Sequence, residues 1–280
     1  MIIPTPYWVS YSEVVKLAEG KSVFINTSVE SNFKNTPAQL EAAITPNTKL
    51  FMFSSPCNPT GSVYNKAELE GLAKVFERYP HVYILSDEIY EHINFIGGHE
   101  SIAQFDSIKD RVVIINGFSK AYAMTGWRIG YTASNKEFAT AFDKMQGQIT
   151  SGTCSITQRA GTAAYEGGLA SVYQMRDAFK KRRDLVYKLL SEIEGIKVNL
   201  PEGAFHFFPD VTSVFGKRYN GRVSNKSDDL SLYLLEEGHV ATVGGDSFGD
   251  PKSMRLSYAA AEDKLVEACR RIKEALGKLG

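Results

Sequence analysis

Short apolar runs alternate with amphipathic helical patterns through the first half of the 280-residue chain. The runs cover residues 23–26, 50–54, 82–86 and 112–116, and a further apolar segment begins at residue 2. Helical patterns cover residues 10–19, 37–44 and 66–79. Strands that alternate with helices are typical of a mostly parallel sheet covered by helices. The four runs are therefore predicted to be buried strands of an α/β domain.

The second half has a different pattern. Residues 135–165 are helical, with glycines that weaken the pattern locally, and a Gly-Gly pair at 167–168 precedes a long charged helix over 170–194. Short strands are expected at 197–200, 205–209, 240–243 and 254–258, with helices at 228–237 and 261–279. We predict a large domain over residues 1–169, then an interdomain helix and a smaller α+β domain over residues 170–280.

Composition excludes several classes of partner. The 32 basic side chains balance the 32 acidic ones, so we expect no nucleic acid partner. The three cysteines show no CxxC spacing, which argues against a disulfide framework or a zinc site and favours a reducing cytoplasm. No apolar run approaches the roughly 20 residues that span a bilayer, so we expect no membrane partner.

Polar segments follow three of the predicted strands: SSPCNPTG, DEIYEH and GFSKAYAMTGWR. In open parallel sheets, ligands bind beyond the carboxyl ends of the strands. That edge would gather an amide, a carboxylate, a phenol, a hydroxyl, an amine and a guanidinium: Asn58, Asp87, Tyr90, Ser119, Lys120 and Arg128. An aldehyde cofactor with a pyridine nitrogen, a ring hydroxyl and a phosphate uses all of these groups, so the set matches pyridoxal 5'-phosphate.

Four blocks in this order, FSSPCNPTG, LSDEIYEH, NGFSKAYAMTGWRIGY and MRLSYA, together with the initial PTPYW, resemble the signature segments of class I, fold-type I aminotransferases of the aspartate aminotransferase family. The resemblance extends over essentially the whole chain. It implies a large domain with a mostly parallel sheet and one antiparallel strand, a smaller C-terminal domain, pyridoxal phosphate as cofactor, and a homodimer.

By this resemblance Lys120 is the catalytic residue, which carries the cofactor through an imine and, once released, moves the substrate proton. Asp87 is expected to pair with the pyridine nitrogen and keep the ring protonated. Tyr90 and Asn58 are expected to hydrogen-bond the ring hydroxyl. The resemblance also implies a cis bond between Asn58 and Pro59.

The resemblance assigns the phosphate to Ser119 and Arg128, the face of the cofactor ring to Trp8, and the substrate carboxylate to Arg255, with Asn58 beside it. For Arg128 to reach the same edge, the strand over 129–132 must run antiparallel to its neighbours. The histidines show no metal-ligand spacing, and His92 and His99 are assigned no role.

Two features depart from the family pattern. The loop before Arg255 reads VGGDSFGD, where the family usually has a proline. In the family, an arm, a strand with a glycine-containing phosphate loop, and a tyrosine donated across the dimer interface precede the PYW segment. None of these can be placed here, so the chain is interpreted as N-terminally truncated.

The leading hypothesis is transamination between an L-amino acid, aspartate-type above all, and a 2-oxo acid such as 2-oxoglutarate. The same type of site also serves carbon–sulfur lyases, and a catalytically weak truncated remnant is a further alternative. A serine-hydrolase elbow at GFSKA is the weakest reading, because Ala121 stands where that motif has glycine.

Overall fold

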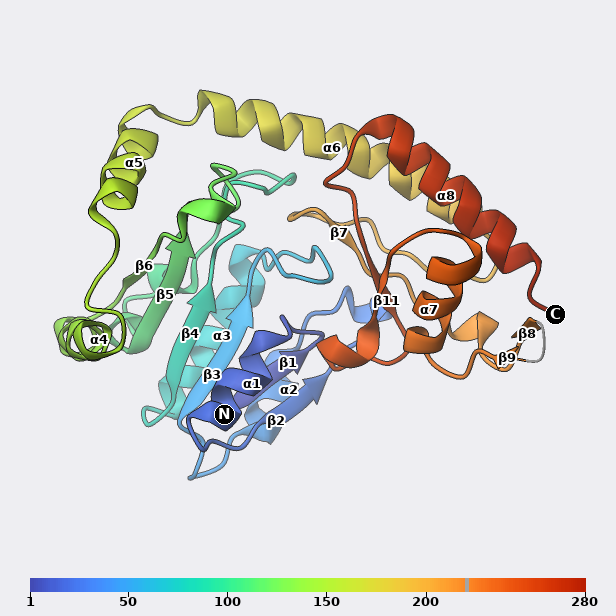
Figure 1. Cartoon of the computed structure of the whole chain (residues 1–280). Helices are drawn as coiled ribbons and strands as arrows, with labels where there is room; N and C mark the ends of the chain where they lie inside the picture. Colours follow the sequence, from blue (N-terminus) through green and yellow to red (C-terminus); the bar gives the residue numbers. More distant parts are fainter. Residues whose placement is uncertain (220–221) are drawn as a thin grey trace.

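A six-stranded sheet dominates the computed structural model, which describes residues 1–219 and 222–280 (Figure 1). The strand order is β2-β1-β3-β4-β5-β6. The strands are β1 (Ile2–Thr5), β2 (Val23–Asn26), β3 (Leu50–Ser54), β4 (Tyr83–Asp87), β5 (Val112–Gly117) and β6 (Gly130–Ala133). The predicted strands are thus present, with ends that shift by about one residue.

One strand runs against the others. β1 to β5 pair in parallel, whereas β6 pairs antiparallel with β5, in the register Ile114↔Ala133 to Gly117↔Gly130. This confirms the antiparallel direction predicted for residues 129–132. Gly117 and Gly130 allow the close approach, because a Cβ on Gly117 would lie 2.8 Å from the Cα of Gly130.

Helices cover the sheet. They include α1 (Ser10–Leu17), α2 (Pro37–Ala43) and α3 (Lys66–Arg78). Asn65 caps α3 by accepting a hydrogen bond from the N–H of Glu68, whose side chain accepts one from the N–H of Asn65 in return. Leu72 on α3 is fully buried in a cluster that includes residues of β3 and β4. The apolar faces of these helices therefore pack against the sheet and form the core with it.

Two regions beside the core correct the sequence prediction. Residues 135–165 form two helices, α4 (Lys136–Ile149) and α5 (Ser155–Glu166), separated at Gly152, whose φ is 150°. β2 is an edge strand with only Ile25 buried, so it is not the buried strand that its apolar sequence predicted. An edge strand packs on fewer neighbours, and the apolar pattern alone does not reveal this.

The C-terminal part has its own small sheets. Its helices are α6 (Ala170–Ser191), α7 (Ser227–Glu237) and α8 (Glu262–Gly277). Its strands are β7 (His206–Phe207), β8 (Arg218–Tyr219), β9 (Arg222–Val223), β10 (Val243–Gly244) and β11 (Met254–Ser257). β10, β11 and β7 form an antiparallel sheet in that order. The β8–β9 pair was not predicted.

The strand predicted at residues 197–200 is absent. Lys197 makes only an isolated bridge with Asp210, and Leu200 is exposed. Figure 1 shows α6 extending from the part that holds the six-stranded sheet to the part that holds α8, against which it packs. Helix α6 begins at the boundary predicted between residues 169 and 170, and the division into two domains remains a prediction. Within residues 1–219 and 222–280, none of the helices combines the length and apolar character needed to cross a membrane.

Candidate active site

The carboxyl ends of β3, β4 and β5 open onto one pocket of about 270 Å³. This volume lies near the lower end of the range for small-molecule sites, roughly 300 Å³ and above. The lining residues are Trp8, Tyr11, Ser54, Asn58, Asp87, Ile89, Tyr90, Ile115, Ser119, Lys120, Thr125 and Arg128. All seven residues predicted to bind the cofactor are among them.

Asp87 is the last residue of β4 and is buried. Its carboxylate accepts a hydrogen bond from the Tyr11 hydroxyl at 2.5 Å and another from the Ile89 N–H at 3.2 Å. Burial raises the pKa of Asp87, and the hydrogen bond from Tyr11 opposes that rise by stabilising the charged form. The pocket thus contains a carboxylate at a fixed position with little access to water.

Lys120 follows β5 and faces the same pocket. Its Nζ lies 5.8 Å from the ring centre of Tyr90 and 5.8 Å from that of Phe205. Burial lowers the pKa of Lys120, the Arg255 cation lowers it further, and the Asp87 carboxylate acts in the opposite direction. A larger fraction of this amine is therefore neutral than for a lysine in water, and a neutral amine can accept a proton.

Arg255 joins this group from the C-terminal part of the chain. It lies on β11, and its Nη1 donates a hydrogen bond to Oδ1 of Asn58 at 3.1 Å. The guanidinium carbon lies 4.8 Å from the ring centre of Phe248. The Asn58–Pro59 bond is cis, as the resemblance implied. Residues 197 positions apart are thus in direct contact beside the pocket.

Of the two groups predicted to hold the phosphate, Ser119 is half-buried and Arg128 is exposed, and both line the pocket. Arg128 lies two residues before the start of β6, has a left-handed backbone with a φ of 52°, and is exposed. It donates a hydrogen bond to the carbonyl of Thr125 at 2.8 Å. Ser119 and Trp8 also line the pocket, and Trp8 is 43% exposed. This side of the pocket is more open than the Asp87 side.

Two neighbours of the pocket were missed by sequence reasoning. Tyr11 lies on α1, three residues after Trp8, and only its hydrogen bond to Asp87 reveals its importance. His206 on β7 is buried, and its Nδ1 has no hydrogen-bond partner among the described residues. Burial lowers the pKa of His206 well below the ordinary value, and the Arg255 and Lys120 cations lower it further. The run GAFHFFPD gave no signal that a neutral imidazole would lie near these cations.

Solved structures of similar fold include aspartate aminotransferases and an aromatic aminotransferase from Pyrococcus horikoshii. The aspartate aminotransferase from Rhizobium meliloti superposes with a TM-score of 0.96 at 43% identity, covering 100% of this chain and 70% of that one. The Thermus thermophilus aspartate aminotransferase with maleate has a TM-score of 0.88 at 36% identity, covering 98% and 69%. Together with the mostly parallel sheet and its single antiparallel strand, this identifies the fold as fold-type I.

Relatives in sequence carry related names. A bifunctional aspartate aminotransferase and glutamate/aspartate-prephenate aminotransferase of Petunia hybrida is 45% identical over 99% of this chain, which spans 59% of the Petunia protein. An aspartate/prephenate aminotransferase of Cereibacter sphaeroides is 46% identical over 98% of this chain, which spans 69% of it. The model of the family Aminotransferase class I and II matches residues 1–272. The chain belongs to the class I and II aminotransferase family.

Proposed function

We propose that this chain catalyses pyridoxal-phosphate-dependent transamination between an L-amino acid of the aspartate type and a 2-oxo acid such as 2-oxoglutarate. One observation carries the proposal. The amine of Lys120 and the buried carboxylate of Asp87 line the same small pocket, and Asn58 on its wall holds the guanidinium of Arg255. Amine, anion and cation are the groups needed at an aldehyde, a pyridine nitrogen and a substrate carboxylate.

The donor set on the inner side of the pocket fits pyridoxal phosphate. Asp87 would pair with the ring nitrogen, Tyr90 and Asn58 would hydrogen-bond the ring hydroxyl, and Lys120 would bind the aldehyde carbon. The cofactor supplies an electron-withdrawing ring, which no side chain offers. The four residues line one pocket, and Asp87 is held there by its own hydrogen bonds, so the inner side is preorganised.

The outer side of the pocket fits the rest of the cofactor. Ser119 would donate a hydrogen bond to the phosphate, and Arg128 can offer its guanidinium fork to two phosphate oxygens. Trp8 would cover one face of the ring. The exposure of Arg128 and Trp8 means that these contacts are more hydrated than those of Asp87.

Lys120 is the residue that would move the substrate proton. Its lowered pKa leaves a larger neutral fraction, which can take a proton from the substrate carbon and return it to a neighbouring atom. Asp87 would not move a proton. Its carboxylate, held by hydrogen bonds from Tyr11 and the Ile89 N–H, would stabilise a positive charge on the ring nitrogen of the bound cofactor.

Arg255 would bind the substrate α-carboxylate. Its guanidinium is partly buried and is oriented by Asn58 and by the ring of Phe248, so the ordering cost on binding is reduced. The names of the relatives from Petunia hybrida and Cereibacter sphaeroides support aspartate as an amino acid substrate. The side chain that would contact the second carboxylate of aspartate is not assigned.

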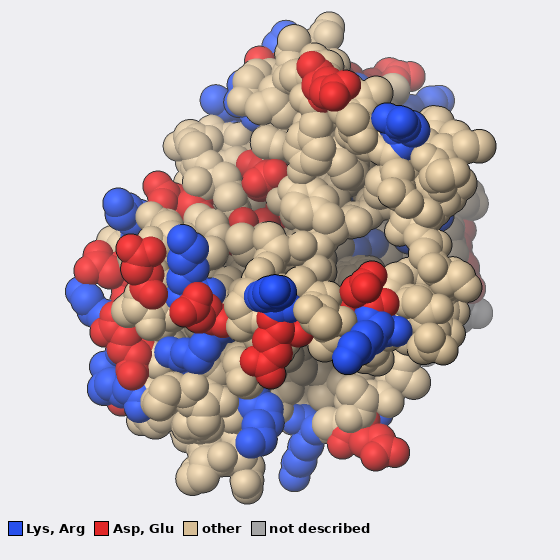
Figure 2. Space-filling view, turned by 90° about the vertical axis from the view of Figure 1, so that its left-hand side faces the viewer, with Lys and Arg blue, Asp and Glu red and all other residues tan. Residues whose placement is uncertain are grey.

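A homodimer is part of this proposal. Apolar side chains are exposed on α4 and α5, where Met145 is 61%, Ile149 72% and Ile156 72% exposed. Figure 2 views the side of the molecule on which these helices lie, and it shows wide uncharged areas between charges of both signs. Exposed apolar surface of this kind is typical of protein interfaces. A second copy of the chain is the proposed occupant.

We also propose that the protein works in the cytoplasm. Its three cysteines, Cys57, Cys154 and Cys269, are all free thiols, which a reducing compartment maintains.

A single-turnover experiment tests the proposed reaction. The chain is loaded with pyridoxal phosphate, mixed with L-aspartate, and its products are separated. We expect one oxaloacetate and one pyridoxamine phosphate per active site, and no product from Lys120→Ala. In a parallel reaction with L-cystathionine and water, release of homocysteine, ammonia and pyruvate would instead identify a carbon–sulfur lyase. Absence of any product from a fully loaded chain would contradict the proposal.

A further inference from the structure

We propose that Glu88 and His99 form a positioning pair behind Asp87, which fixes this carboxylate and reinforces the negative charge that it presents to the pocket. This inference rests on the proposed function, because it takes Asp87 as the partner of the cofactor's ring nitrogen. Neither Glu88 nor His99 lines the pocket, so both would act through Asp87.

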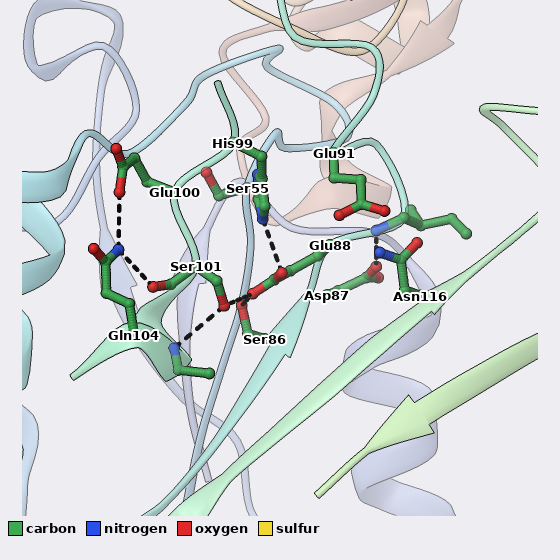
Figure 3. Close-up of polar contacts among 12 residues, drawn as sticks. Ser55, Ser86, Asp87, Glu88, Glu91, His99, Glu100, Ser101, Gln104 and Asn116 are labelled. Carbon is green, nitrogen blue, oxygen red and sulfur yellow. Dashed lines mark hydrogen bonds and ion pairs between the residues drawn. The ribbon is translucent and has the colours of Figure 1, made fainter. Parts of the chain in front are cut away.

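The end of β4 carries two consecutive carboxylates that point in different directions (Figure 3). Asp87 faces the pocket, whereas Glu88 turns toward the segment that follows the strand and is 3% exposed. The Glu88 carboxylate accepts hydrogen bonds from Ser86 Oγ at 2.9 Å, Ser101 Oγ at 2.6 Å and His99 Nε2 at 2.8 Å. Three donors on one buried carboxylate satisfy it as an anion.

The backbone transmits this anchoring to Asp87. The N–H of Glu88 donates to the carbonyl of Ile115 at 2.8 Å, and the N–H of Ser55 donates to the carbonyl of Asp87 at 3.2 Å. The peptide between the two carboxylates is thus tied to the strands on both sides of β4. With Glu88 also held by its side chain, Asp87 has little freedom to move away from the pocket.

The charge of Glu88 acts on the same carboxylate. Burial is the main reason that the pKa of Asp87 is raised, and the negative charge of Glu88 adds to that rise. A second anion in a poorly hydrated region makes the potential at Asp87 more negative. The cofactor's ring nitrogen, as the partner of Asp87, would therefore hold its proton more tightly when Glu88 is charged than when Glu88 is neutral.

His99 holds Glu88 from the far side. His99 Nε2 lies 2.8 Å from the Glu88 carboxylate, and because an ionised carboxylate can only accept, we assign the proton to this nitrogen; the buried Nδ1 has no partner among the described residues. One ligand atom of each of Glu88, Glu91 and His99 lies within 4.8 Å of the others, which is a spacing that a metal ion could use. We interpret the cluster as a hydrogen-bonded clamp, because three donors already occupy Glu88.

Other titratable groups lie around Asp87 and around the Glu88–His99 pair. Tyr11 from α1 and Lys120 from the segment after β5 face Asp87. On the other side, the Glu91 carboxylate lies near His99 and pairs with His92 at 3.2 Å. Glu91 bonds to Glu88 through its backbone N–H, which a side-chain substitution retains. Glu91→Gln therefore removes a nearby charge without touching the clamp and serves as the matched control.

The test measures the ring nitrogen directly. The chain is loaded with ¹⁵N-labelled pyridoxal phosphate, and the ¹⁵N chemical shift is followed with pH. In Glu88→Gln the pH at which this nitrogen loses its proton should fall by about one unit relative to the parent. His99→Leu should lower it by less, and His99→Gln, which retains a donor, should restore the parent value. Glu91→Gln should leave it unchanged.

The outcomes separate this inference from the proposed function. A parent chain that binds no cofactor at Lys120 contradicts the proposed function. If the parent binds the cofactor and the ring nitrogen loses its proton at the same pH in the parent, in Glu88→Gln and in His99→Leu, only the positioning pair is contradicted. If Glu88→Gln does not fold, the ¹⁵N titrations of His99→Leu and His99→Gln still test the positioning pair, because only His99→Gln retains a donor to Glu88. A purely structural clamp would lower the unfolding midpoint in urea and leave the ¹⁵N titration in place.

Discussion

The inner edge of the sheet, where β3, β4 and β5 end, differs in burial from the outer layer, which is formed by the edge strand β6 and helix α4. At the end of β4 and just after it, Asp87 and Tyr90 are buried, and Asp87 accepts hydrogen bonds from the Tyr11 hydroxyl and the Ile89 N–H. In the outer layer, β6 is exposed along its whole length and α4 has no buried residue. The half of the pocket that contains Asp87 is therefore fixed within one chain, whereas the half predicted to face the phosphate includes Arg128 and Trp8, which are exposed to solvent.

Asp87→Asn should have the largest effect, because it removes the anion at the rigid edge. We expect the rate of single-turnover transamination to fall by about 100- to 10,000-fold. Attachment of the cofactor to Lys120 should persist, since that step needs no protonated ring. Asp143→Asn on the outer helix α4 is the matched control and should retain the parent rate. Equal rates for Asp87→Asn and the parent would remove the functional distinction between the two regions.

Packing should show the same contrast. Leu72 is fully buried on α3, so Leu72→Ala should lower the free energy of unfolding by about 2 to 5 kcal/mol. Ile149→Ala on α4 should change it by less than about 0.5 kcal/mol, because that side chain is already exposed. Urea unfolding at low protein concentration measures both. A large loss in Ile149→Ala under these conditions would mean that α4 contributes to the core after all.

Arg255 and Arg128 differ in burial, and their replacement by lysine should have effects of different size. Arg255→Lys should raise the KM for the amino acid by about 10- to 100-fold, because a lysine cannot replace an oriented guanidinium. Arg128→Lys should weaken cofactor binding by less than about tenfold, since this cation is exposed and keeps its charge. Steady-state kinetics and a cofactor titration give the two values. A larger effect of Arg128→Lys than of Arg255→Lys would indicate that the exposed Arg128 makes the stronger contact.

His206 predicts a smaller, pH-dependent effect. The folded chain keeps His206 neutral because its pKa is lowered, whereas the unfolded chain binds a proton below about pH 6.5. Stability should therefore fall as the pH drops below 6.5, by up to about 1.4 kcal/mol per pH unit from this residue. His206→Phe should remove that part of the slope, and the exposed His81→Phe should not. Identical slopes for both variants would show that His206 is not held neutral.

Much of this architecture could be predicted from the pattern of the sequence. The inner strands are continuous apolar runs with polar segments after them, and parallel strands bring those segments to one edge. This pattern alone was enough to predict that Asn58, Asp87 and Lys120 lie together. The antiparallel direction of β6 also followed, from the position of Arg128 before its strand and not after it.

Contacts between distant segments could not be predicted in the same way. The hydrogen bond of Tyr11 to Asp87 and the clamp of His99 on Glu88 depend on where a helix and a loop return to the sheet. The alternating sequence at residues 197–200 predicted a strand, but only Lys197 forms a bridge, and it does so with Asp210 outside any strand. The helical pattern over residues 135–165 predicted one segment, but Gly152 adopts a positive φ and separates two helices.

Reduction of the cofactor-loaded chain with borohydride shows which lysine carries the cofactor. An imine between the cofactor and a lysine becomes a stable amine, which peptide mapping can locate. We expect the reduced cofactor on the peptide containing Lys120, at one equivalent per chain, and none on Lys120→Ala. A label on another lysine, or no label on a chain that retains the cofactor through gel filtration, would contradict it.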